Sequence, residues 1–283
     1  MAGAGTMGSG IAIVAARAGF QTVLFDVDET VVQRASDQIG SFLTRSVERG
    51  RLTAEQREAA LRGLTASSDV EQLSDCSFVI EAVFEDPLVK GEVLARINKL
   101  CSPEAIFASN TSTLSITALG AASGRPERFV GMHFCLPAQI MKLVEMTPGL
   151  VTDPTTFETA WQVCVALGQQ PVRTQDRPGF ILNHFIVPFN NDAIRLVESG
   201  AAEPAEVDRA VKGGLGYPMG PCELLDYVGL DTQERLCDAL FPVTNDPRAA
   251  CPPLVRRMVA AGHLGRKTGR GFYSYDGPAM FGA

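Results

Sequence analysis

Apolar residues in the first part of the chain fall into short continuous runs separated by longer stretches with helical spacing. Short runs bounded by turn residues are typical of buried strands, and the stretches between them predict helices. Strands that alternate with helices favour a parallel α/β sheet. We expect strands at residues 21–26, 78–83, 105–110, 128–134, 141–147 and 170–174 and helices at residues 8–19, 28–50, 87–100 and 155–168.

The pattern changes at the segment "DRPGF", residues 176–180. Beyond it the apolar spacing is helical, with two long helical patterns at residues 180–200 and 205–218, and no clear strand precedes the tail. We therefore expect an α/β domain over residues 1–177 and an all-α domain over residues 178–283.

Composition and charge narrow the class of protein. A net charge of −7 gives no support to nucleic acid or an anionic membrane as the main partner. The seven cysteines form no C-x-x-C pair, which indicates reduced thiols and a cytoplasmic protein. The three histidines lack metal-ligand spacing, and no apolar run is long enough to cross a membrane. We therefore expect neither a metal site nor a membrane span.

The chain opens on "MAGAGTMGSGIA", which contains the G-x-G-x-x-G pattern of a dinucleotide-binding turn. The pattern alone is weak, because a glycine-rich start would look the same. An acid at the end of the next predicted strand, 23 residues after Gly3, strengthens it, since a carboxylate there accepts hydrogen bonds from the ribose 2′-hydroxyl. The acid also disfavours a 2′-phosphate, so we expect NAD bound by a Rossmann-type domain. The candidate cofactor residues here are Gly3, Gly5, Thr6, Met7, Gly8 and Asp26.

This motif normally follows a buried strand. Here only Met1 and Ala2 precede it, and two residues do not make a strand. In a Rossmann-type fold the strand before the glycine turn lies centrally in the sheet. Its loss would leave buried backbone groups unpaired, at about 1–3 kcal/mol each. We therefore expect Met1 to be an internal methionine, with a strand of about five residues upstream.

The densest polar chemistry lies between residues 109 and 145. The segment "SNTS" follows a predicted strand, at the sheet edge where α/β proteins place their ligands. His133 lies near the end of an apolar strand, and Glu145 follows in another apolar segment, where a carboxylate needs a partner. If the two strands are neighbours, Glu145 can orient His133 as a general base. A core histidine bonded to backbone and an unrelated acid would give the same pattern.

Eight segments together resemble the 3-hydroxyacyl-CoA dehydrogenases, close to the stand-alone 3-hydroxybutyryl-CoA type. They run from residue 3 to residue 275, and their order makes the resemblance specific. The segments are "GAGTMGSGIA", "VIEAVFED", "ASNTSTLSI", "GMHF", "MKLVE", "RPGFILN", "YPMGPCELLDYVGLD" and "LGRKTGRGFYSY".

The resemblance implies a role for each matching residue. His133 would take the 3-hydroxyl proton, and Glu145 would orient it. Ser112 and Asn183 would hydrogen-bond the oxygens of the substrate. The residues implied to line the NAD site are Glu85, Lys90, Asn110 and Lys267. For Asn110 a structural role in the turn stays open, as does a solvated position for Lys267.

Two departures from the family pattern bear on activity. Leu136 stands where the family carries an asparagine, whose hydrogen bonds leucine cannot replace. Loss of such a contact could cost about 1–3 kcal/mol if its partner stays buried. His184 stands where an arginine is common.

The predicted activity is the NAD-dependent interconversion of (3S)-3-hydroxyacyl-CoA, such as 3-hydroxybutyryl-CoA, and 3-oxoacyl-CoA. The resemblance also implies a homodimer through the helical domain. A dehydrogenase of a 3-hydroxy acid without CoA is one alternative. A catalytically impaired binding or structural homologue is another, suggested by Leu136 and the short start.

Overall fold

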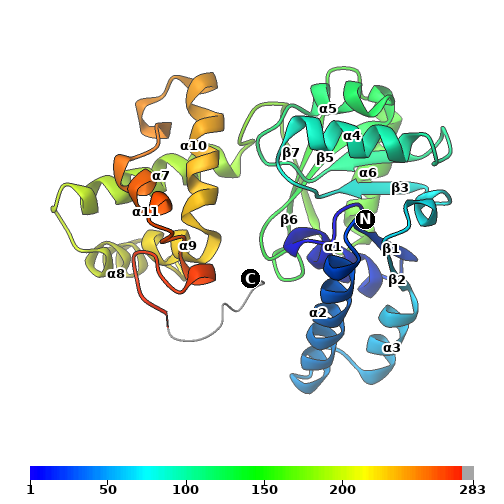
Figure 1. Cartoon of the computed structure of the whole chain (residues 1–283), viewed down its shortest axis with the longest axis horizontal. Coiled ribbons are helices and arrows are strands. Elements are labelled where there is room, and N and C mark those ends of the chain that lie inside the picture. Colours follow the sequence, from blue (N-terminus) through cyan, green and yellow to red (C-terminus); the bar gives the residue numbers. More distant parts are fainter. Residues whose placement is uncertain (276–283) are drawn as a thin grey trace. The chain divides into compact units, whose positions relative to one another are not determined.

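The chain forms two compact units that divide between Arg177 and Pro178 (Figure 1). The structure, a computed structural model, describes residues 1–275. The first unit combines helices with a mainly parallel sheet, and the second is helical apart from short bridges near its end. The predicted fold class is therefore confirmed.

The first unit carries all the strands of the described residues and six of their α-helices. Its strands are β1 (Thr22–Phe25), β2 (Leu64–Ser67), β3 (Phe78–Glu81), β4 (Ile106–Ser109), β5 (Phe129–Phe134), β6 (Leu143–Pro148) and β7 (Gln170–Arg173). Its helices are α1 (Thr6–Arg17), α2 (Glu29–Glu48), α3 (Ala54–Arg62), α4 (Pro87–Asn98), α5 (Ile116–Ser123) and α6 (Pro154–Ala166). A capping box begins α3, since Thr53 and Gln56 bond reciprocally there.

The strands are ordered β3-β4-β5-β6-β7 in one part of the sheet and β1-β2 in the other. Neighbouring strands are parallel except for β5 and β6, which are antiparallel. The expectation of a parallel sheet is wrong for this pair. The connection between them, residues 135–142, is too short for a parallel crossover, which needs a dozen or more residues.

The opening residues of the chain occupy the place of the strand that we expected before the glycine turn. Ala2 forms parallel bridges to Phe25 on β1 and to Glu81 on β3. Its carbonyl oxygen accepts a hydrogen bond of 2.8 Å from the Ala82 N–H. These bridges join the two parts of the sheet, so the backbone around Ala2 is paired on both sides.

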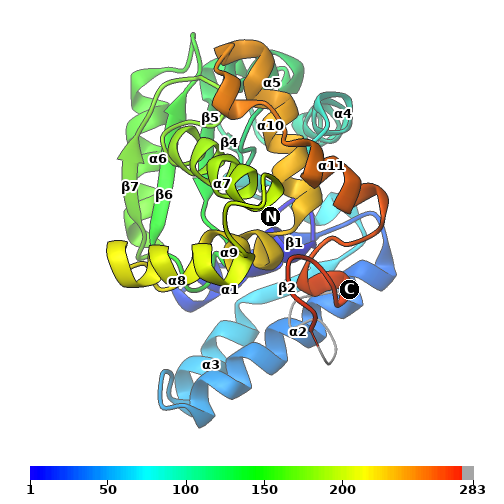
Figure 2. The same ribbon diagram turned by 90° about the vertical axis from the view of Figure 1, so that its left-hand side faces the viewer.

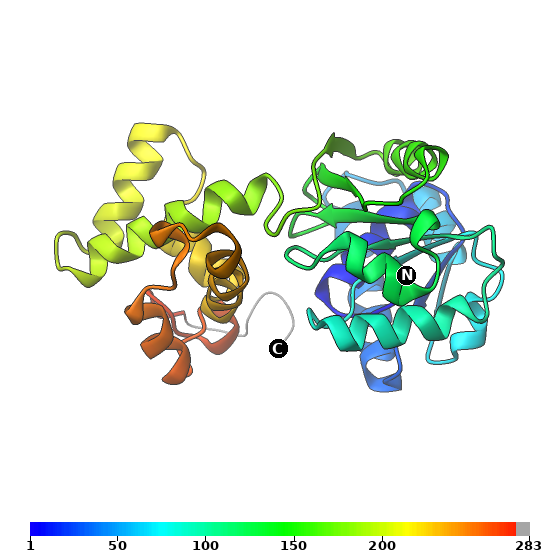
Figure 3. The same ribbon diagram turned by 90° about the horizontal axis from the view of Figure 1, so that it is seen from above.

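Helices cover both faces of the sheet, and the alternation along β5 shows which helix covers which face. Val130, Met132 and Phe134 pack in one hydrophobic cluster with residues of α1, α2 and α6. Phe129 and Gly131, which point the other way, lie against α5. Figure 3 shows the strands between α6 on one side and α4 and α5 on the other. The helices α2 and α3 lie side by side (Figures 1 and 2).

The second unit is built from α7 (Leu182–Glu198), α8 (Pro204–Leu215), α9 (Pro221–Val228), α10 (Leu230–Thr244) and α11 (Pro253–Ala260) (Figure 2). A buried aspartate on α9 anchors the segment that follows α11. The Asp226 carboxylate accepts hydrogen bonds of 2.9 Å from the backbone N–H groups of Phe272 and Tyr273. This anchors the "GRGFYSY" segment to the helical core.

Candidate active site

The glycine turn before α1 has two positions that only glycine fits. Gly3 has a φ of +102°, and a Cβ there would lie 2.6 Å from the Ala82 carbonyl oxygen. A Cβ on Gly8 would lie 1.9 Å from the carbonyl oxygen of Gly3. The two glycines therefore let the turn, the end of β3 and the first turn of α1 come into close contact.

The start of α1 has the properties of an anion-binding helix end. Gly5 is its N-cap, no side chain within residues 1–275 caps it, and its first turn holds no acid. Its first N–H groups therefore suit the pyrophosphate of a dinucleotide. Asp26 follows β1, and its Oδ2 accepts a hydrogen bond of 2.8 Å from the Ala4 N–H, which fixes the carboxylate beside the turn. The residues present fit NAD.

The close contact at Gly8 leads to a prediction for cofactor binding. Gly8→Ala should raise the Kd for NADH about tenfold or more, because the added methyl group displaces the Gly3 carbonyl and distorts the turn. Quenching of NADH fluorescence measures this Kd. Gly40→Ala is the matched control, since a Cβ there has no atom within 4 Å. An unchanged Kd in Gly8→Ala would show that this turn does not bind the cofactor.

His133 and Glu145 lie directly opposite each other on the antiparallel strands β5 and β6. The His133 Nδ1 and the Glu145 Oε2 are 2.7 Å apart. The Glu145 side chain is fully buried and that of His133 is 12% exposed. With Glu145 ionised, its carboxylate can only accept hydrogen bonds, and the Nδ1 of His133 would be the donor of this pair. The neutral tautomer that donates there carries its accepting lone pair on Nε2.

Glu85 organises the loop of residues 111–113, which we call the Ser112 loop. Its Oε1 accepts hydrogen bonds from the Ser112 N–H at 2.9 Å and from the Thr113 N–H at 3.2 Å. The Thr111 hydroxyl donates to the same oxygen. Burial works to raise the pKa of Glu85, but the nearby Lys90 and these hydrogen bonds outweigh it and lower the pKa.

Lys90 lies beneath this loop rather than on an open surface, with a side chain that is only 1% exposed. Its Nζ lies 2.6 Å from the Glu81 Oε1 and 3.2 Å from the Glu85 Oε2. Asn110 holds the neighbouring strand, because its Oδ1 accepts a hydrogen bond of 2.9 Å from the Phe134 N–H. Both residues therefore have a structural role in the first unit, and their contact with NAD stays a prediction.

Two of the predicted site residues belong to the second unit. Asn183 is buried in the first turn of α7, where its N–H donates to the Gly179 carbonyl at 3.0 Å. Lys267 forms an ion pair with Asp231 at the start of α10, so it is not merely a solvated tail residue. Leu136 lies on the connection between β5 and β6 and is 37% exposed.

The sequence analysis pointed to the segment "SNTS" but gave no individual role to Ser109 or Thr111, and it gave none to Glu81 or Thr113. Glu81 and Ser109 are fully buried and hydrogen-bonded to each other at 2.6 Å. The signal was available for Glu81, because a carboxylate in the apolar strand "FVIEAV" needs a partner, as Glu145 does.

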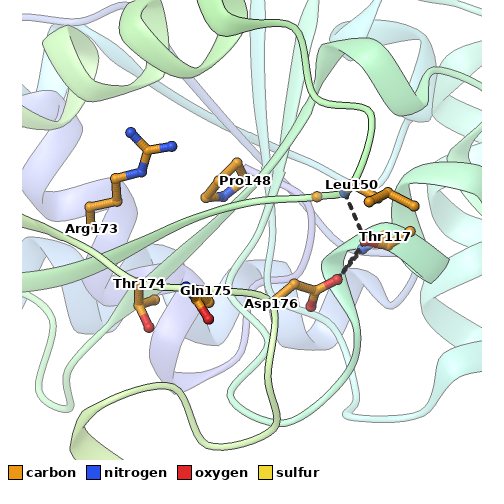
Figure 4. A pocket seen from close by; sticks show the side chains of 8 residues that line it. Thr117, Pro148, Leu150, Arg173, Thr174, Gln175 and Asp176 are labelled. Atoms are coloured by element: carbon orange, nitrogen blue, oxygen red, sulfur yellow. Dashed lines mark hydrogen bonds between the residues drawn. The ribbon is translucent and has the colours of Figure 1, made fainter.

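A pocket of about 580 Å³ lies elsewhere on the first unit, and none of the predicted site residues lines it. Its wall includes Thr117, Leu150, Arg173 and Asp176 (Figure 4). The Asp176 carboxylate accepts hydrogen bonds from the Ile116 N–H at 2.8 Å and from the Thr117 hydroxyl at 2.6 Å. Asp176 therefore acts as an added cap for α5.

Two absences apply to the part of the chain that the structure describes, residues 1–275. No helix there has both the length and the apolar character needed to cross a membrane. No group of three or more histidine, cysteine, aspartate or glutamate side chains there could hold a metal ion.

The sequence matches two family profiles that together span nearly the whole chain. The profile "3-hydroxyacyl-CoA dehydrogenase, NAD binding domain" matches residues 1–177. The profile "3-hydroxyacyl-CoA dehydrogenase, C-terminal domain" matches residues 179–275.

Individual relatives agree with these profiles. A 3-hydroxybutyryl-CoA dehydrogenase of Mycobacterium tuberculosis H37Rv is 44% identical over 275 residues, which are 96% of each chain. The mitochondrial hydroxyacyl-coenzyme A dehydrogenase of Rattus norvegicus is 41% identical over 96% of this chain and 89% of its own.

Two crystal structures are also similar. M. tuberculosis FadB2 has a TM-score of 0.94 and 44% identity, with 97% of each chain covered. The (S)-3-hydroxybutyryl-CoA dehydrogenase PaaH1 of Ralstonia eutropha has a TM-score of 0.91 and 38% identity, with 98% of each chain covered.

Proposed function

Because the chain belongs to the 3-hydroxyacyl-CoA dehydrogenase family and is an NAD-dependent dehydrogenase, we propose that its substrate is a short-chain (3S)-3-hydroxyacyl-CoA. The product is the matching 3-oxoacyl-CoA, and the reaction also runs in reverse. The observation that carries the proposal is the His133–Glu145 pair, in the same unit as a turn that fits NAD. Relatives named as 3-hydroxybutyryl-CoA dehydrogenases support a four-carbon acyl group.

His133 is the general base of the proposed reaction. Its Nε2 takes the proton of the 3-hydroxyl group while the hydride leaves C3, so the C–O bond becomes a carbonyl. NAD, when bound, would supply the acceptor for that hydride. In the reverse direction His133 returns the proton to the oxygen of the 3-oxo group.

Glu145 makes His133 a better base in two ways. The hydrogen bond of 2.7 Å at Nδ1 selects the tautomer whose Nε2 can accept a proton. Its buried negative charge then stabilises the imidazolium that forms. Ser112 and Asn183 donate hydrogen bonds to the substrate oxygens, where negative charge develops.

The proposed NAD site lies at the glycine turn of the first unit. Asp26 accepts hydrogen bonds from the adenosine ribose and disfavours a 2′-phosphate, so NAD is used rather than NADP. The residues that we assign to the cofactor are Gly3, Gly5, Thr6, Met7, Gly8, Asp26, Glu85, Lys90, Asn110 and Lys267.

The assembly that we propose is a cytoplasmic homodimer formed through the second unit. Helix α7 exposes Phe185 and Leu196, and α8 exposes Leu215, so these helices offer apolar surface for a partner. All seven cysteines are free thiols, as expected in a reducing compartment. The acidic net charge argues against a nucleic-acid partner.

A comparison of two substrates tests the proposed function. We expect the protein to oxidise NADH rapidly with acetoacetyl-CoA and at least about 100-fold more slowly with free acetoacetate, because the CoA part supplies binding energy used in the transition state. The loss of NADH absorbance measures both rates. Activity on the free acid alone would favour a dehydrogenase of non-CoA 3-hydroxy acids. Binding of NADH without oxidation would favour an inactive homologue.

A further inference from the structure

We propose that Glu81 is a positioning residue that holds the Ser112 loop in place through Lys90 and Ser109. This assignment rests on the proposed function of Ser112 as a substrate contact. It concerns a buried acid at the end of β3 to which the resemblance assigned no role.

Both carboxylate oxygens of Glu81 have close partners, although the side chain is fully buried. Oε1 accepts hydrogen bonds of 2.6 Å from the Lys90 Nζ and from the Val83 N–H. Oε2 accepts one of 2.6 Å from the Ser109 hydroxyl. Burial raises the pKa of Glu81, whereas Lys90 and the hydrogen bonds act to lower it. A buried ion pair contributes little to stability when compared with an apolar pair of similar size. Stability alone therefore does not account for this network, which fits a role in positioning the groups around it.

The first route from Glu81 to the Ser112 loop runs through Lys90 and Glu85. The Lys90 ammonium lies between two carboxylates, at 2.6 Å from Glu81 and 3.2 Å from Glu85. Glu85 turns one oxygen to Lys90 and the other to the N–H of Ser112. If Glu81 lost its charge, Glu85 would be the only carboxylate within 4 Å of that ammonium among the described residues. The stronger attraction would then draw Glu85 away from the loop.

The second route runs through Ser109, which ends β4. Because its hydroxyl donates to Glu81, its oxygen lone pairs face the following loop, and it accepts a hydrogen bond of 3.2 Å from the Thr111 N–H. The Ser112 loop is therefore held by two acceptors, Ser109 and Glu85. Glu81 fixes the position of both.

The glycine turn packs against backbone that Glu81 itself helps to hold, since the Glu81 Oε1 accepts a hydrogen bond from the Val83 N–H. Ala2 is held by the Ala82 N–H and by the Ile80 carbonyl, and Gly3 packs against the Ala82 carbonyl. Because Lys90 and Glu85 are also assigned to the NAD site, loss of the Glu81 charge should weaken NADH binding as well as disturb the Ser112 loop. Dependence of the catalytic loss on Ser112 therefore separates a positioning role from a general structural one.

Glu81→Gln tests the proposal, because it keeps the shape of the side chain and removes its charge. We expect kcat/KM for acetoacetyl-CoA, measured at saturating NADH, to fall about tenfold or more. In a Ser112→Ala background the same change should cost less than about twofold, since the group that Glu81 positions is gone. Glu104→Gln, an exposed acid of the same unit, is the control and should behave as wild type.

Multiplicative losses in kcat/KM for Glu81→Gln and Ser112→Ala would overturn the proposal, as would an unchanged kcat/KM in a folded Glu81→Gln variant. If Glu81→Gln shows no cooperative thermal unfolding, Ser109→Ala decides, since it leaves all charges in place. A loss of about threefold confined to acetoacetyl-CoA supports the role, and an unchanged kcat/KM overturns it.

The rate of the wild type alone tests the proposed function, whereas the ratio of variant to wild type tests Glu81. If the wild type prefers a free 3-oxo acid, the ratio is measured with that acid. If it turns over neither substrate, the ratio of acetoacetyl-CoA dissociation constants from calorimetry takes its place.

Discussion

Replacement of His133 by glutamine should lower kcat by a factor of about 10² to 10⁴, the usual contribution of a positioned general base. Glutamine has nearly the size of histidine and can still contact Glu145, but it cannot take a proton near neutral pH. The loss should appear in kcat, because the hydroxyl proton moves in the chemical step. Steady-state oxidation of NADH with acetoacetyl-CoA measures it.

Two controls show whether the loss is chemical. The Kd for NADH should stay within about twofold of the wild-type value, since β5, which carries His133, is not a neighbour of Ala2 or β1 in the sheet. His263→Gln, in the second unit, should leave kcat unchanged. Turnover by His133→Gln at the wild-type rate would show that another group is the base.

Glu145→Gln should lower kcat by a factor of about 10² to 10⁴ for a different reason. The amide can donate a hydrogen bond to the His133 Nδ1 at the position where the carboxylate accepts one. Histidine would then carry its proton on Nε2 and could not act as a base. The buried charge that stabilises the imidazolium is lost as well. Measured kcat, together with an unchanged NADH Kd, checks this expectation.

The double variant of His133 and Glu145 adds a sharper criterion. If Glu145 acts only through His133, its replacement in a His133→Gln background should reduce kcat by less than about threefold. Glu158→Gln on α6 is a matched control for removal of an acid and should have no effect. Multiplicative losses in the double variant would assign Glu145 a role of its own.

The local pattern of the first unit could be predicted because its strands are short, apolar and bounded by turn residues. The strand β2 was missed, since "LTAS" is only partly buried and carries no apolar alternation. The direction of β6 was also missed, because an apolar run does not show whether its neighbour is parallel. Only the short connection over residues 135–142 carried that information.

Parts of the candidate site could be predicted where a charged residue lies in an apolar segment, which is costly without a partner, or where residues follow a known motif spacing. Glu145 was found because a carboxylate in an apolar run needs a partner, and β5 and β6 place that partner opposite it. The same argument applies to Glu81, but no histidine lies on a neighbouring predicted strand to suggest a role for it. The Glu85 contacts with the Ser112 loop join residues about 27 positions apart, and no local pattern reports such a pairing.

The central claim is that His133 transfers the proton of the 3-hydroxyl group in the chemical step. Its most direct test is a stopped-flow measurement in which enzyme saturated with NADH is mixed with acetoacetyl-CoA, for the wild type and for His133→Gln. We predict rapid single-turnover loss of NADH absorbance in the wild type and a rate lower by about 10² or more in the variant. Equal single-turnover rates in the two proteins would contradict the account.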